Sequence, residues 1–300
     1  MLTRDTDAIW RLAEPQWAEI GANTPDLVPA IALQRRLLRL MLDALRAVER
    51  VRPIELTVQP AREKWHRGLP ALRSETISIP PGLNRFLPPL CTALAECGAG
   101  ESALHIRDAI TSKNIDADSL LAVSLARNQK AVRTSALHMG FSPDLVWLIG
   151  ELGSAPLAHH LSSAFELSAP RDDEWDRGYC PICGSWPALI ESRDGSAKLR
   201  CSYCAFEWSL RSNRCLYCGN DGADFVTAAP DINEPQRRVE LCGRCSGYTK
   251  VIEVLSPTPF PLLAIHDLAT MSLDQGAMNR GYRRPALFDL DAIEPRASTC

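Results

Sequence analysis

The sequence has no apolar stretch of the kind that crosses a membrane. None of its 300 residues lies in a run approaching the ~20 uninterrupted apolar residues that a membrane-spanning helix needs. The opening residues MLTRDTD carry charges of both signs and no apolar core follows them, which argues against a secretory signal peptide. We therefore expect a cytoplasmic protein without membrane insertion.

The sequence also lacks an excess of charge of either sign. The formal net charge is -3. Between Asp176 and Lys250, 10 Lys and Arg stand against 9 Asp and Glu, which leaves a net charge of +1. A domain that grips phosphate groups is usually more basic than this. We expect no nucleic-acid partner.

The common catalytic motifs are missing as well. The chain has no Walker-type phosphate loop, no His-Glu-x-x-His and no Gly-x-Ser-x-Gly. No histidine lies between residues 171 and 250. The sequence predicts a protein that is not an enzyme, and it carries no signal for an oligomeric state.

Cysteine, in contrast, is abundant, with 11 residues. In a reducing compartment, clustered cysteines indicate metal or redox chemistry rather than disulfides. Three cysteines are solitary, and the other eight form four Cys-x-x-Cys pairs. These pairs are Cys180/Cys183, Cys201/Cys204, Cys215/Cys218 and Cys242/Cys245.

The spacing of the four pairs indicates an internal duplication. The first two pairs are separated by 17 residues, the last two by 23, and only 10 residues join the two halves. Consecutive pairing predicts one site from Cys180, Cys183, Cys201 and Cys204. The second site would then consist of Cys215, Cys218, Cys242 and Cys245. A nested or cross-braced arrangement of the same residues is the alternative.

Four thiolates are a typical tetrahedral ligand set for zinc or iron. Gly184 and Gly219 directly follow second cysteines, where a residue that tolerates positive φ is useful. A thioredoxin-like redox pair is disfavoured, because that motif occurs once per domain at the start of a helix. All-sulfur sites are coordinatively closed and leave no position for an activated water, which argues against a metallohydrolase.

The N-terminal part of the sequence reads as helical. Thr24-Pro25-Asp26 and Ser142-Pro143-Asp144 are helix-start signals, each followed by apolar residues at helical spacing. Further helices are expected across residues 84–97, 103–112 and 116–138. These segments predict an irregular helical domain.

The C-terminal part predicts short strands between the cysteine pairs. Alternation of apolar and polar residues favours a strand over 205–211, and β-branched and aromatic residues favour a strand over 248–255. A last helix is expected over 263–279. The fold class is therefore α+β: a helical N-terminal domain, then a double rubredoxin-like or zinc-ribbon-type domain with short strands, and a C-terminal helix. A polar linker at 168–174 gives domains 1–170 and 171–255, with a tail of 256–300 packed on the fold.

The cysteine pairs and their neighbours resemble the family of the formate dehydrogenase accessory protein FdhE, over roughly residues 178–290. The motifs that carry the resemblance are Cys180-Pro181-Ile182-Cys183-Gly184-Ser185, Leu199-Arg200-Cys201 with Cys204 and Glu207-Trp208, Cys215 with Cys218, Cys242 and Cys245 with Gly247-Tyr248 and Lys250, Asp267-Leu268-Ala269, Leu273-Asp274, Gly281-Tyr282 and Leu287-Phe288.

The resemblance implies a cytoplasmic maturation chaperone. Its client would be the catalytic subunit of a respiratory formate dehydrogenase, bound before export by the twin-arginine route. The resemblance also implies two iron ions, with zinc possible in their place. The alternatives are a rubredoxin-like one-electron redox protein and a zinc-ribbon protein that binds nucleic acid.

Four residues of the polar C-terminal segment are candidates for contact with a partner protein. These are Asp267, Asp274, Tyr282 and Arg283. The alternative is that the same segment simply packs the last helix onto the fold.

Overall fold

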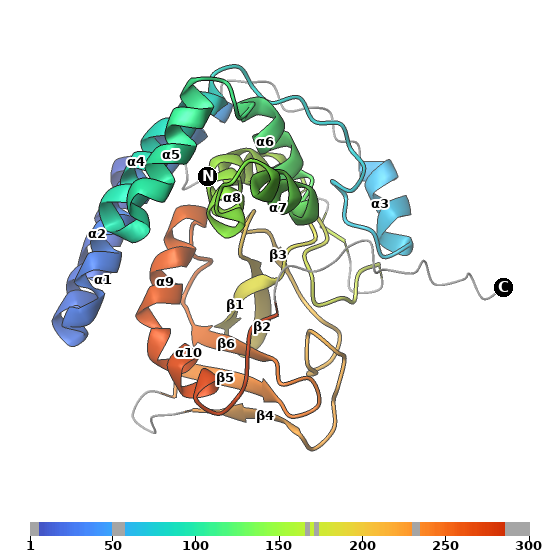
Figure 1. Ribbon diagram of the computed structural model, residues 1–300. Helices are drawn as coiled ribbons and strands as arrows, with labels where there is room; N and C mark the ends of the chain where they lie inside the picture. The colour runs from blue at the N-terminus through green and yellow to red at the C-terminus, as the bar shows by residue number, and fades with distance from the viewer. Residues whose placement is uncertain (1–5, 50–57, 166–168, 171–173, 230–234, 286–300) are drawn as a thin grey trace. The chain divides into compact units, whose positions relative to one another are not determined.

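The computed structural model describes residues 6–49, 58–165, 169–170, 174–229 and 235–285 (Figure 1). Its internal contacts divide the chain into two compact units. A helical unit comprises residues 1–56, 74–164 and 260–265, and a metal-domain unit comprises residues 57–73, 165–259 and 266–300. The chain thus passes between the units several times. The division into domains 1–170 and 171–255 with a tail of 256–300 stays a prediction. The predicted linker at 168–174 lies mostly outside the described residues, and the Leu287-Phe288 motif lies wholly outside them.

The helical unit is organised around helix α8, which contacts α2, α4, α6 and α7. Small residues on α8 allow this close packing. A Cβ atom added to Gly150 would lie 2.2 Å from Ser124 Oγ of α6, and one added to Gly153 would lie 2.4 Å from Leu87 Cδ2 of α4. The helices of this unit are α1 (Thr6–Asn23), α2 (Val28–Glu49), α4 (Leu87–Leu94), α5 (Gly100–Thr111), α6 (Ala117–Leu125), α7 (Gln129–His138) and α8 (Pro143–Ser163), and the short turns are η2 (Pro25–Leu27), η3 (Leu83–Phe86), η4 (Ala95–Ala99) and η6 (Phe260–Leu262).

The metal-domain unit contains a six-stranded sheet of order β3-β2-β1-β6-β5-β4. All neighbouring strands pair antiparallel except β1 and β6, which pair parallel at the centre. The strands are β1 (Pro187–Arg193), β2 (Ser196–Cys201), β3 (Glu207–Trp208), β4 (Phe225–Ala228), β5 (Arg237–Cys242) and β6 (Tyr248–Glu253). Helices α3 (Val58–His66) and α10 (Met271–Met278) also belong to this unit, and α10 packs against β5 and β6. Helix α9 (Leu263–Ala269) spans the division between the units.

The sheet has the internal repeat that the cysteine spacing predicts. Strands β1 to β3 follow and flank the first two cysteine pairs, and β4 to β6 have the same relation to the last two pairs. In both halves the hairpin's second strand ends at a cysteine, Cys201 in β2 and Cys242 in β5. The predicted α+β class, with its helical part and its duplicated four-cysteine domain, is confirmed.

Several predicted elements are shorter or interrupted. The expected helix over 116–138 is two helices, because Arg127 adopts a left-handed φ of 58° and Asn128 then caps α7 by accepting from the N–H of Ala131. The strand expected over 205–211 is reduced to β3, because Ala205 also has a positive φ of 58°. The last helix is divided near Thr270, whose hydroxyl donates to the carbonyl of His266.

Helices α1 and α3 were not predicted from the sequence. Within the described residues, no helix combines the length and the apolar character that crossing a bilayer requires.

Candidate metal centre

Each cysteine pair lies in a tight turn that is held by backbone hydrogen bonds. The N–H of Cys180 donates to the carbonyl of Ser185, and the N–H of Gly184 donates back to the carbonyl of Cys180, both at 2.9 Å. Cys215 and Gly219 repeat the arrangement in the second half, where the acceptor for the N–H of Cys215 is Asn220 O at 2.8 Å. The same local geometry in both halves follows from the repeated Cys-x-x-Cys-Gly sequence.

All four turns place a left-handed residue directly after the second cysteine. Gly184 and Gly219 have φ values of 83° and 73°, as the sequence predicts for glycines at these positions. Ala205 and Ser246 occupy the equivalent positions with φ values of 58° and 54°. Because a side chain disfavours this conformation, two of the four turns carry backbone strain.

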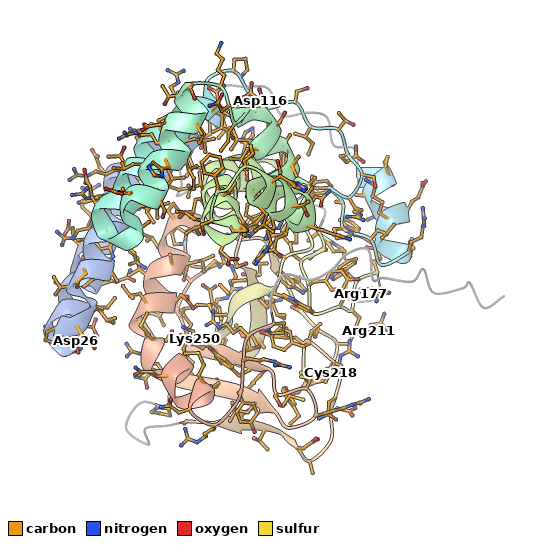
Figure 2. The ribbon with its side chains drawn as sticks, viewed as in Figure 1. Asp26, Asp116, Arg177, Arg211, Cys218 and Lys250 are labelled. Atoms are coloured by element: carbon orange, nitrogen blue, oxygen red, sulfur yellow. The ribbon has the colours of Figure 1, made fainter. Side chains whose placement is uncertain are left out.

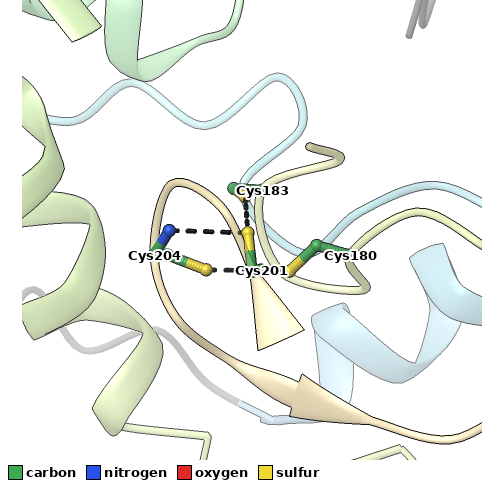
Figure 3. Close-up of side chains that lie close together, drawn as sticks. All are labelled: Cys180, Cys183, Cys201 and Cys204. Carbon is green, nitrogen blue, oxygen red and sulfur yellow. Dashed lines mark hydrogen bonds between the residues drawn. The ribbon is translucent and has the colours of Figure 1, made fainter. Parts of the chain in front are cut away.

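The first cluster consists of Cys180, Cys183, Cys201 and Cys204, and all four side chains are buried (Figure 3). The Sγ atoms of Cys180 and Cys204 are 3.6 Å apart, and those of Cys183 and Cys201 are 3.4 Å apart. Backbone N–H groups point at the sulfurs: that of Ile182 donates to Cys180 Sγ at 3.4 Å. The N–H groups of Tyr203 and Cys204 both donate to Cys201 Sγ at 3.4 Å.

The second cluster consists of Cys215, Cys218, Cys242 and Cys245. Its sulfur pairs have similar separations, 3.6 Å for Cys215 and Cys245 and 3.7 Å for Cys218 and Cys242. Its burial is different, because Cys218, which Figure 2 labels, is exposed and Cys245 is only partly buried. The grouping in both clusters is that of the consecutive pairing.

The sulfur geometry fits a tetrahedral metal ion. With metal–sulfur bonds of about 2.3 Å, the edges of an S₄ tetrahedron measure about 3.8 Å, and a disulfide would require about 2.05 Å. The observed separations of 3.4–3.7 Å are near the first value and far from the second. All ten described cysteines are free. In each cluster the four sulfurs lie within 4.8 Å of one another, and the described residues contain no other group of this kind.

The electrostatics of the clusters also favour a bound cation. Burial raises the pKa values of the Cys180 and Cys204 thiols well above the ordinary value, so four thiolates would not form there without a compensating positive charge. In the second cluster, burial opposes ionisation of Cys242, but the backbone N–H of Cys245 and the Asn220 side chain outweigh it. They and the neighbouring thiols lower the pKa of Cys242 to about 7.

A segment far away in the sequence supports the first cluster. The indole N–H of Trp65 and the backbone N–H of Ala71 both donate to the carbonyl of Pro181, each at 2.8 Å. The N–H of Leu72 donates to the carbonyl of Ile182 at 2.9 Å. These bonds hold both residues between Cys180 and Cys183. The sequence did not predict this role of Trp65, Ala71 and Leu72, because the residues around Trp65 form no pattern typical of a metal site.

A series of aromatic rings connects the two halves of the metal domain. Trp175 contacts Tyr179, Tyr179 contacts Trp186, and Trp186 contacts Tyr217, with centroid separations of 5.1, 6.1 and 4.9 Å. Tyr179 directly precedes Cys180, and Tyr217 lies between Cys215 and Cys218. The packing around one cluster is therefore continuous with the packing around the other.

The acidic partner-binding candidates lie in an intramolecular ion network. Lys250, which Figure 2 labels, is fully buried and contacts the carboxylates of Asp267 at 2.8 Å and Asp274 at 2.6 Å. Arg284 contacts the same two carboxylates at 2.9 Å, and the Tyr248 hydroxyl donates to Asp274 at 2.8 Å. Burial alone would raise the pKa of Asp267, but Lys250 and Arg284 hold it below its ordinary value.

The other two candidates lie beside the second cluster. Tyr282 packs against the small apolar cluster that contains Tyr248 and Ala277. The backbone N–H of Arg283 donates to the carbonyl of Ser246 at 2.8 Å, and its side chain is exposed. The structure thus brings the C-terminal segment to the fourth cysteine turn; contact of these four candidates with a partner stays a prediction.

Together, the fold and the two clusters define a class of protein: a helical unit combined with a duplicated four-cysteine domain of the rubredoxin and zinc-ribbon type. Comparison with known proteins shows which family in this class the chain resembles. No family model matches the sequence. An FdhE homologue from Aquifex aeolicus is 27% identical over 240 residues, which are 76% of this chain and 77% of the relative.

Two further comparisons agree with this relationship. An FdhE homologue from Shewanella oneidensis is 36% identical over 107 residues, which are 34% of this chain and 35% of that protein. The crystal structure of the FdhE protein from Pseudomonas aeruginosa shares the fold, with a TM-score of 0.60 and 22% sequence identity. The match covers 94% of this chain and 95% of that one. The chain is thus similar to FdhE proteins in sequence and in fold, and the resemblance inferred from its cysteine motifs is confirmed.

Proposed function

We propose that the protein is a cytoplasmic maturation chaperone for the catalytic subunit of a respiratory formate dehydrogenase. It binds this client before twin-arginine export, and it acts as a binding protein rather than as an enzyme. Its relationship to FdhE proteins and its two four-cysteine clusters support the proposal.

The observation that carries the proposal is the closed character of the two clusters. Each offers four sulfurs at tetrahedral separations, so a bound ion would have all its positions filled by protein ligands. Such an ion supplies folding free energy, on the order of 10–16 kcal/mol for structural zinc in small finger peptides. The clusters therefore serve to shape a surface that a client can bind.

We propose iron as the bound metal, with zinc as the alternative, because both accept four thiolates in a tetrahedron. Iron in such a site can also carry one electron. Metal analysis of protein isolated without exposure to air identifies the ion. A reversible change in visible absorption on reduction would add a redox role, whereas colourless protein filled with zinc would remove iron from the proposal.

The test of client binding is an anaerobic affinity isolation from cells that produce a respiratory formate dehydrogenase. The bait proteins are the wild-type chain, a Cys218→Ser variant and a Cys97→Ser variant, which changes a partly exposed cysteine outside the clusters. We expect mass spectrometry to detect the catalytic subunit, with its export signal still attached, in the wild-type and Cys97→Ser samples and much less of it with Cys218→Ser. Recovery of no formate dehydrogenase subunit by the wild-type bait would contradict the proposal.

A further inference from the structure

The metal-domain unit contains a cleft of about 290 Å³ that neither cluster uses. One wall is the segment that precedes the first cysteine turn, and another is the segment that precedes the second. Charged side chains dominate its lining. The lining residues are Trp65, His66, Glu174, Asp176, Arg177, Arg211 and Arg214.

The two carboxylates of the cleft are already engaged by cations. Arg214 contacts Asp176 through Nη2 at 2.7 Å from Oδ2, and it also donates to the Asp176 carbonyl at 3.0 Å. The backbone N–H of Arg211 donates to the other carboxylate oxygen of Asp176 at 3.1 Å. Glu174, whose side chain is only 4% exposed, lies 3.5 Å from Arg62 Nε. The ion-pair partners recorded for the two acids are Arg62 and Arg214, and Arg177 is not among them.

Arg177 is held in the cleft by packing rather than by an ion pair. Its guanidinium lies over Gly68, where an added Cβ would be only 2.4 Å from Nη2, and Gly68 has a φ of +71°. Its backbone carbonyl accepts from the Trp208 indole at 3.0 Å. Within the part of the chain that the structure describes, no carboxylate forms a salt bridge with Arg177. The Arg177 guanidinium is therefore held at the cleft by packing, and its positive charge is available to bind an anion.

We propose that this cleft binds an oxyanion group, a phosphate or a carboxylate, with Arg177 as the principal contact. Three arginines against two acids give the lining a formal charge of +1, and the planar guanidinium fork matches both oxyanions in a bidentate manner. Arg211 and Arg214 also line the cleft and add positive charge to it, and Figure 2 labels Arg177 and Arg211. The inference goes beyond the proposed function and does not depend on it, because the cleft's residues are not cluster ligands.

The test is isothermal titration of the full-length, metal-loaded protein with inorganic phosphate and, separately, with malonate. Both titrations are made against chloride at equal ionic strength. We expect saturable binding at one site with a dissociation constant below about 1 mM for at least one anion. Arg177→Gln should weaken that binding by about tenfold or more, because it removes a charge-assisted pair of hydrogen bonds. Binding of phosphate alone or of malonate alone identifies which oxyanion the cleft takes.

The matched control is Arg133→Gln, which removes an exposed arginine paired with Asp144 in the helical unit. It should leave the affinity unchanged. Arg177→Lys keeps the charge but loses the fork, so it should bind more weakly than wild type and more tightly than Arg177→Gln. If Arg177→Gln fails to fold, Arg177→Lys and Arg211→Gln take its place, and both should weaken binding. Absence of saturable binding by wild type, or equal losses in the cleft variants and in Arg133→Gln, would overturn the inference.

Discussion

The two cysteine clusters share one backbone design but differ in their surroundings. In the first cluster the four cysteines are at most 3% exposed. In the second, Cys218 is exposed and Cys245 is partly exposed. The neighbours differ as well, because the segment around Trp65 donates hydrogen bonds to the first cysteine turn, and among the described residues it donates none to the second cluster's turns. A set of four cysteine ligands on the same turn geometry can thus be fully buried in one half and partly exposed to solvent in the other.

The largest expected effect is the loss of a ligand. Cys180→Ser should remove the ion from the first cluster and, with it, a contribution on the order of 10 kcal/mol that structural metal sites supply. We expect the metal-domain unit to unfold. Cys215→Ser should empty the second cluster and cost less, because fewer groups are buried around it. Metal content and thermal unfolding of the two variants check this comparison, and equal, wild-type-like stability of both would refute the structural role of the ions.

The buried ion pairs of the two halves should give the next largest effect. Arg200→Met leaves Glu191, which is fully buried, without its 2.7 Å partner, and should lower the free energy of unfolding by about 3–5 kcal/mol. Lys250→Met should cost less, about 3 kcal/mol at the lower limit of that class, because Arg284 still contacts Asp274. Chemical denaturation of the metal-loaded variants measures both values. A larger loss from Lys250→Met than from Arg200→Met would show that Arg284 does not compensate.

The difference in exposure should appear as a difference in rate. Because Cys218 is accessible to solvent, we expect a chelator to remove metal from the second cluster about tenfold faster, or more, which corresponds to about 1.4 kcal/mol in activation free energy. Alkylation of the freed thiols, followed by mass spectrometry, identifies the cluster that opens first. Early labelling of Cys180 or Cys204 would reverse the comparison.

The smallest effects concern the turns. Ser246→Gly and Ala205→Gly should raise the free energy of unfolding by about 0.5–1 kcal/mol, because glycine relieves the positive φ at both positions. Gly219→Ala should lower it by about 1–2 kcal/mol, a cost of backbone conformation alone, since an added Cβ there meets no atom within 4 Å. Thermal unfolding of the three variants tests these signs. Stabilisation by Gly219→Ala would contradict the argument.

The cysteine spacing was sufficient to predict the grouping of the clusters and the duplication, because ligands of one ion must be close and Cys-x-x-Cys fixes each pair locally. The prediction that a glycine directly after the second cysteine of a pair adopts a positive φ was also correct, at Gly184 and Gly219. It could not identify Ala205 or Ser246, whose left-handed conformations are imposed by the same turn on residues that do not favour it.

Other features depend on contacts between distant segments and left no local pattern. The support of Pro181 by Trp65 joins residues 116 positions apart. The break at Arg127 depends on a single left-handed residue within an otherwise helical sequence. The pairing of Lys250 with Asp267 and Asp274 was likewise hidden, because acids in a polar tail are usually solvated and these are engaged by a buried lysine.

The parallel pairing of β1 with β6 joins the repeats along a single hydrogen-bonded seam. Ile190, Glu191 and Ser192 align there with Val251, Ile252 and Glu253. Removing either repeat would leave β1 or β6 without its partner strand. The unpaired backbone N–H and C=O groups along that strand could then pair with a strand of another chain. An isolated repeat should therefore self-associate, with the open strand edge of one copy pairing with that of another.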